Sequence, residues 1–323
     1  MRLPTSTALR VGDALAGWPP PLLDPAGPYA GSIATLSWLL FAIGGLVTLV
    51  VLAALWIALF GSERRKQQLG GAKTVVIGGV VFPVVVLTGL LVWGLSLTGS
   101  LTAPICGDEM RVRVTGEMWW WRVAYLDERG RDVALDANEL HIPVGQPVVL
   151  ELTSADVIHS FWVPRLSGKL DMIPGRTTLM RIQADAPGTF GGQCAEYCGG
   201  PHALMGFVVV AHPRERFAAL MAQRRAPRPA VAPSRGEQLF RAVGCAACHR
   251  IAGTGANGLA GPDLTHVATR QTLGAGILPN NRGTLMGWIA DSQAIKPGNR
   301  MPTYKTLPAA DLAAITDYLG SQR

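Results

Sequence analysis

Two cysteines, a histidine and a methionine lie close together in the segment "CAEYCGGPHALM". Cys194 and Cys198 are four residues apart, and His202 and Met205 follow within the next seven residues. In an oxidising compartment a disulfide is the ordinary state of two such cysteines. Thiolate, imidazole and thioether together, however, are the soft ligand set that selects copper at electron-transfer sites. The segment therefore predicts a copper centre.

The number of cysteines indicates how many copper ions this centre holds. A mononuclear blue-copper site uses one cysteine and two histidines, whereas two thiolates can bridge two copper ions that each need one imidazole. The loop supplies only His202, so the second imidazole should come from another loop at a strand end. The segment "SADVIHSFWVP" places His159 directly after the strand-like run "PVVLELTS". We expect His141, His212 and His266 to be structural or surface residues.

A second redox motif, "CAACH", spans Cys245 to His249 and is the pattern for covalent attachment of a c-type haem. Cys245 and Cys248 would form the thioether bonds, and His249 would bind the iron. A redox disulfide or half of a zinc site are the alternatives, but no second C-x-x-C pair lies nearby in the sequence. For the sixth iron ligand we prefer Met301, on the Pro/Gly-rich segment "KPGNRMPTY", to Met286, which we expect to be buried on a helix.

The N-terminal third of the chain has the composition of a membrane anchor. The 323 residues are 49% hydrophobic with a mean hydropathy of +0.26 and a net charge of +7. Uncharged stretches at 33–60 and 74–107 each exceed the roughly 20 residues that a helix needs to cross a bilayer. The turn "GSERRKQQLGGAK" between them is basic, which places it in the cytoplasm and both termini outside. We expect no nucleic-acid partner.

The remainder of the chain reads as two soluble domains. Alternation in "MRVRVTGEMWWWRVAY" and β-branched runs such as "MGFVVVAH" predict a small all-β sandwich or barrel over 108–212. Residues 213–233, with "RRAPRPAVAPSR", predict a semi-rigid extended linker. Residues 234–323 follow as a helical domain, with a helix capped by Ser234 and another that starts near Pro308 and stops at Gly320. Residues 1–32 form an outer N-terminal segment, and 33–107 form the helical hairpin.

These motifs together resemble subunit II of a haem-copper cytochrome c oxidase with a cytochrome c domain fused at its C-terminus, the caa type. The resemblance implies a membrane-anchored multidomain fold: a two-helix transmembrane hairpin, an all-β cupredoxin-like domain and an all-α class I cytochrome c domain. It also implies a dinuclear copper A centre with six ligands. These are His159, Cys194, the carbonyl of Glu196, Cys198, His202 and Met205.

The resemblance also assigns roles around the centre. The Glu196 side chain would reach a magnesium site shared with subunit I. Trp119, the first tryptophan of "WWW", would be the surface point where electrons enter, whereas Trp121 is expected to pack in the core. The loop "LSGKLDMIPGR" would dock on subunit I through Asp171 and Arg176.

The function implied is that of the subunit through which electrons enter an oxidase that reduces oxygen to water. Electrons from cytochrome c or a membrane-bound cytochrome would pass through haem c and copper to subunit I, in a complex that also contains subunit III. We expect this chain in the bacterial cytoplasmic membrane, with its soluble domains on the periplasmic side. The same centres would also serve a copper-containing nitric oxide reductase or a free-standing membrane-tethered electron carrier.

Three positions depart from the family pattern or stay unassigned. Val76 stands where many members have a glutamate associated with proton uptake. Trp18 occupies the position of the cysteine that carries a lipid anchor in some relatives. Cys106, at the outer end of the second span, is left with a packing role.

Charge counts indicate how the two soluble domains interact. Residues 108–212 hold 9 basic and 13 acidic side chains, whereas 234–323 hold 9 basic and 5 acidic ones. Because opposite net charges attract at long range, we expect the haem domain to dock on the copper domain near Trp119. We expect this docking to be transient and sensitive to salt.

Overall fold

The computed structural model describes residues 21–102, 109–227 and 232–323. The chain divides into two compact units, one of residues 31–104 and the other of residues 1–30 and 105–323. We call the described part of the second the extramembrane unit. Trp18 and Cys106 lie outside the described residues, so their expected roles stay predictions.

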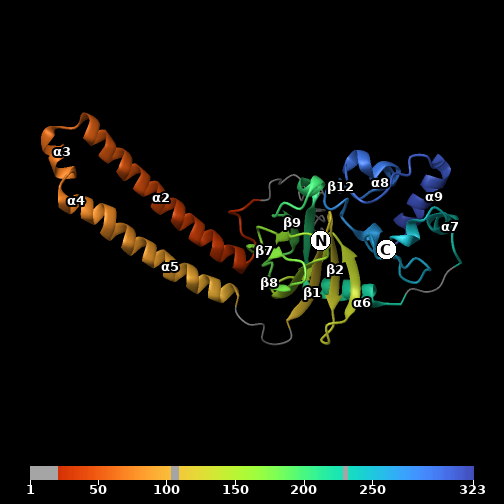
Figure 1. Cartoon of the computed structure of the whole chain (residues 1–323). Coiled ribbons are helices and arrows are strands. Elements are labelled where there is room, and N and C mark those ends of the chain that lie inside the picture. Colours follow the sequence, from red (N-terminus) through yellow and green to blue (C-terminus); the bar gives the residue numbers. More distant parts are fainter. Residues whose placement is uncertain (1–20, 103–108, 228–231) are drawn as a thin grey trace, which may run out of the picture. The chain divides into compact units, whose positions relative to one another are not determined.

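Long apolar helices form at both expected spans (Figure 1). The first is α2 (Pro28–Phe60), and the second run, Ala72–Leu101, has a mean hydropathy of 2.7 with none of its most apolar window buried in the protein. Pro83 lacks the N–H that would bond one turn back, and a π-helical segment precedes it. The second run comprises α4 (Ala72–Val76), η1 (Ile77–Val81) and α5 (Phe82–Leu101), so Val76 ends α4. The basic turn holds a short helix, α3 (Glu63–Leu69).

The β domain is a sandwich of two five-stranded sheets, as the alternating sequence predicts. One sheet has the order β3-β2-β1-β5-β8 and the other β4-β10-β9-β6-β7. Pairing is antiparallel except between β1 and β5 and between β4 and β10. The strands are β1 (Met110–Glu117), β2 (Trp120–Leu126), β3 (Asp132–Ala137), β4 (Glu139–Pro143), β5 (Val148–Ser154), β6 (His159–Trp162), β7 (Lys169–Met172), β8 (Thr178–Ile182), β9 (Gly188–Cys194) and β10 (Gly206–His212).

The core of the sandwich supports the loop between β9 and β10. Trp121 is fully buried, as expected, and its indole N–H donates to the carbonyl of Gly206 at 3.0 Å. Its ring meets Phe161 and Phe207 edge-on, with centroids 5.9 and 5.7 Å apart. Such aromatic contacts add to the burial of apolar area. The packed core therefore fixes Gly206, where the β9–β10 loop ends.

The expected extended linker is wrong for its first half. Residues Arg214–Arg225 form helix α6, and Met221 and Arg224 on it are buried. The Pro-rich composition signal comes from the residues after Arg225, whereas α6 is stabilised by contact with the sandwich. Arg224 donates to the buried carboxylate of Asp136 on β3. The β domain thus extends through α6.

The last domain is helical at both ends, as predicted. Helix α7 (Arg235–Ala242) is capped by Ser234, which accepts from the N–H of Glu237, and α9 (Ala309–Gly320) follows Pro308. Phe240 and Tyr318 pack these helices together. The elements between them are η3 (Cys245–Ala247), η4 (Val267–Thr269), β11 (Thr272–Leu273), β12 (Leu278–Pro279) and α8 (Arg282–Ile295).

Candidate metal and haem sites

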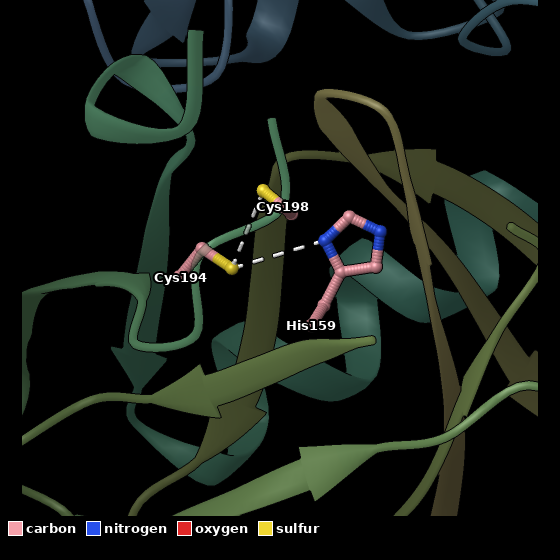
Figure 2. Close-up of side chains that lie close together, drawn as sticks. All are labelled: His159, Cys194 and Cys198. Carbon is pink, nitrogen blue, oxygen red and sulfur yellow. Dashed lines mark hydrogen bonds between the residues drawn. The ribbon is translucent and has the colours of Figure 1, made fainter. Parts of the chain in front are cut away.

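Cys194 at the end of β9, Cys198 in the loop that follows it and His159 at the start of β6 point toward one another (Figure 2). The Sγ atoms of Cys194 and Cys198 are 3.9 Å apart, too far for a disulfide, and Nδ1 of His159 lies 3.8 Å from Sγ of Cys194. All three side chains are buried, and their ligand atoms lie within 4.8 Å of one another. The geometry is therefore that of a metal site, in which the thiols are separate ligands.

The remaining expected ligands lie around the same two sulfurs. The carbonyl oxygen of Glu196 is 3.2 Å from Sγ of Cys194. On the other side, Nδ1 of His202 and Sδ of Met205 lie 3.5 and 3.8 Å from Sγ of Cys198. The structure thus brings all six expected donors together. Each cysteine sulfur has the other sulfur and two further donor atoms around it. The Glu196 side chain itself is exposed.

A carboxylate orients the imidazole of His159. Its Nε2 lies 2.9 Å from Oδ1 of Asp156, which leaves Nδ1 directed at Cys194. Burial alone would lower the pKa of His159, but the hydrogen bonds to Cys194 and Asp156 outweigh it and raise that pKa. Histidines that bind metals usually donate their second ring N–H to such a partner. Asp156, which orients this expected ligand, was not predicted from the sequence, although it stands three residues before His159.

The paired thiols suit a cation. The hydrogen bond with Cys198 lowers the pKa of Cys194, while the same bond, burial and the negative charge of Cys194 raise the pKa of Cys198. Without a metal, only one of the two is readily a thiolate. A copper ion would compensate the second negative charge, because metal binding displaces protons from its ligands. The donor set of thiols, imidazoles and a thioether therefore fits copper.

The second site is a cavity of about 300 Å³ whose lining includes the two cysteines and the histidine of the CAACH motif. Cys245, Cys248 and His249 lie on one part of its wall, and Met301 also lines it, whereas Met286 is absent from the lining. Both cysteines are free thiols. The lining is mainly apolar, as a porphyrin requires. This arrangement supports Met301 over Met286 as the sixth ligand.

His249 is held in the tautomer that can bind iron. Its Nδ1 lies 2.8 Å from the carbonyl oxygen of Pro262, so Nδ1–H donates and Nε2 is left as the acceptor. Burial lowers the pKa of His249, which favours the neutral ring. A Cβ on Gly261 would lie 2.7 Å from the ring, so glycine is needed here. The pocket therefore fits a haem with His249 as a ligand.

The other expected residues are placed as follows. Trp119 is half-buried, lines the haem cavity and donates through its indole N–H to the carbonyl of Cys198 at 2.9 Å. It thus lies between the two sites. Asp171 at the end of β7 and Arg176 beyond it are both exposed, as residues for a partner would be.

Buried polar contacts join the haem-binding segment to the sandwich within the extramembrane unit. Arg270 is 7% exposed and donates to Asp136 at 2.8 Å, and the backbone N–H of Gln271 donates to Glu139. Arg270 and Trp119 both line the haem cavity, so these contacts lie near the tryptophan at which docking is expected. Because these contacts are buried, salt should screen them little. They therefore differ from the transient, salt-sensitive docking that the charge counts predict. Arg270 was not predicted from the sequence.

Comparison with known proteins gives matches for both soluble parts. Residues 128–212 match the family "Cytochrome C oxidase subunit II, periplasmic domain", and residues 233–323 match "Cytochrome c". Cytochrome c oxidase subunit 2 from Alkalihalophilus pseudofirmus is 37% identical over 93% of this chain and 90% of its own length. The subunit 2 from Bacillus sp. strain PS3 is 31% identical over 81% of this chain and 78% of its own length.

A solved structure matches as well. The periplasmic domain of subunit II of the cytochrome oxidase of Bradyrhizobium japonicum is 28% identical, with a TM-score of 0.35, over 38% of this chain and 97% of that domain.

The fold and the two sites define a membrane-anchored electron-transfer protein, in which a copper-binding β-sandwich precedes a cytochrome c domain. The chain belongs to the cytochrome c oxidase subunit 2 family, in the form with a fused cytochrome c domain. It works in a haem-copper oxidase as an oxidoreductase subunit, associates with other oxidase subunits and a cytochrome donor, and carries a copper site and a haem.

Proposed function

We propose that electrons from a cytochrome donor reach a covalent haem c, continue to a dinuclear copper A centre, and leave for the haems of catalytic subunit I, which reduces oxygen to water. The observation that carries the proposal is the convergence of four further donors, two imidazoles, a thioether and a carbonyl, on two thiol sulfurs 3.9 Å apart. Neither the matched families nor the relatives favour the nitric oxide reductase or the free-standing carrier.

The copper and haem, when bound, supply the reversible gain and loss of one electron, and the protein supplies fixed geometry. His159, Cys194, Cys198, His202, Met205 and the carbonyl of Glu196 would hold two copper ions. Cys245 and Cys248 would anchor the haem, and His249 and Met301 would bind its iron. Ligands held on rigid elements rearrange little when charge moves, which favours rapid transfer.

Several contacts of the chain also belong to the proposal. Trp119 would be the residue through which electrons reach the copper ligands, because its indole N–H bonds to Cys198. The exposed Glu196 carboxylate would bind magnesium at the boundary with subunit I, and Asp171 and Arg176 would contact that subunit. Subunit III would complete the assembly in the bacterial cytoplasmic membrane, with the soluble domains in the periplasm.

The proposal is tested by metal analysis of the chain purified in mild detergent. We expect two copper ions and one haem per chain, and the haem should stay attached after denaturation. One copper per chain would contradict the dinuclear centre. Oxygen and nitric oxide consumption by the complex that co-purifies with the chain then distinguishes the oxidase from a nitric oxide reductase.

A further inference from the structure

Lys296 is a buried lysine at the end of α8 that no motif assigns. The residue is 2% exposed. Its Nζ donates to three main-chain carbonyl oxygens: Trp119 at 2.7 Å, Leu204 at 2.8 Å and Gly274 at 3.0 Å. Trp119 and Leu204 belong to the copper-binding sandwich, whereas Gly274 and Lys296 itself belong to the haem-binding domain. One ammonium group therefore joins three separate chain segments.

The geometry requires the charged form of the lysine. Three acceptors at hydrogen-bond distance match the three N–H groups of an ammonium, whereas a neutral amine has only two. Burial lowers the pKa of Lys296 to about 7, and a thiolate at Cys198 would act in the opposite direction. A buried charge is costly unless it is fully hydrogen-bonded. Lys296 meets that condition through carbonyls on both sides of the domain boundary.

The three acceptors adjoin the functional residues. Leu204 directly precedes Met205, and Trp119 is itself bonded to Cys198 through its indole N–H. Gly274 directly precedes Ala275, whose carbonyl accepts the N–H of Gly206 at 2.9 Å. This approach needs a glycine at 206, because a Cβ there would lie 2.8 Å from the Ala275 oxygen. Lys296 thus ties the haem-binding domain to Trp119 and to Leu204 in the β9–β10 loop, the copper loop, which holds most of the expected copper ligands.

We propose that Lys296 is a positioning residue for electron transfer: its ammonium fastens the haem-binding domain to the backbone of the copper loop and of Trp119. The two redox sites are thereby kept in one arrangement, and a positive charge is fixed beside the copper ligands. The second consequence rests on the proposed function, because it needs bound copper. The first does not, since it concerns contacts of the chain alone.

The test compares Lys296→Met with Lys305→Met in the full chain in detergent. Both variants remove one positive charge from the same domain, but Lys305 is exposed and pairs only loosely with Asp291, at 3.7 Å. Hydrogen exchange of the Gly206 amide is measured at a pH of about 6, where the ammonium form predominates. We expect exchange roughly 10-fold faster or more in Lys296→Met, because hydrogen bonds to a charged group are lost. The amide of Val114 in β1 should be unchanged.

Equal Gly206 exchange in the wild type and both variants would overturn the proposal, as would equal acceleration of Gly206 and Val114, which indicates general destabilisation. Lys296→Gln, which keeps two N–H donors, should exchange at an intermediate rate and serves if Lys296→Met does not fold. In the copper-loaded chain, the reduction potential of copper should fall in Lys296→Met but not in Lys305→Met. A chain that binds no copper would refute the proposed function, while the exchange measurement would still decide the role of Lys296.

Discussion

Asp136 offers the sharpest test of how the extramembrane unit is stabilised. Its side chain is fully buried between the guanidinium groups of Arg224 on α6 and Arg270 in the haem-binding domain, and both arginine side chains are buried as well. The change Asp136→Asn keeps the shape of the side chain and removes its charge. The two buried cations then lose the carboxylate that they share, and Arg224 keeps only the weaker attraction of Glu139.

The expected loss in the free energy of unfolding is about 3–5 kcal/mol, the usual effect of removing one partner of a buried ion pair. Asp132→Asn is the matched control, because Asp132 lies on the same strand and pairs with Arg113, but the two side chains are 48% and 36% exposed. Exposed pairs contribute only about 0–1 kcal/mol. The contrast between the two variants therefore measures the effect of burial.

Unfolding should be followed by tryptophan fluorescence in urea, because guanidinium is itself a salt and screens charges. Repeating the measurement in about 1 M sodium chloride should leave the Asp136→Asn deficit in place and remove that of Asp132→Asn. A deficit for Asp136→Asn no larger than that of its control would refute the reasoning. It would mean that the attraction between Asp136 and the two arginines only balances the cost of removing their charges from water.

Three further outcomes are expected. Burial alone would raise the pKa of Asp136, but Arg224 and Arg270 outweigh it and hold that pKa well below its usual range. The wild type should therefore exceed Asp136→Asn in free energy of unfolding by the full amount above about pH 4, and by less as the pH falls further. Urea unfolding at each pH measures this difference. Cys194→Ser should abolish the copper signal in electron paramagnetic resonance and leave the haem attached, and loss of both would contradict separate sites. Met301→Ala should remove the absorption band of sulfur-ligated haem, whereas Met286→Ala should retain it; the reverse result would reassign the ligand.

Most of the chemistry could be predicted from the amino-acid sequence. Spacing within a short loop fixes which donors lie together, so Cys194, Cys198, His202 and Met205 could be read without a fold. The CAACH motif is likewise local, and long uncharged runs leave few alternatives to membrane-spanning helices. Alternation along β1 predicted the buried face correctly because a strand has a period of two residues.

The contacts between distant segments could not be predicted from the sequence, because they form only when the chain folds. Asp156 and Lys296 stood in segments already singled out, but hydrogen bonds across the fold give them their roles, and no local pattern encodes those. Helix α6 was read as linker because its stability comes from packing and from the Arg224–Asp136 pair rather than from an apolar stripe. Charge counts gave the signs of the two domains but not that Arg270 and Asp136 are buried, because burial depends on which surfaces meet when the chain folds.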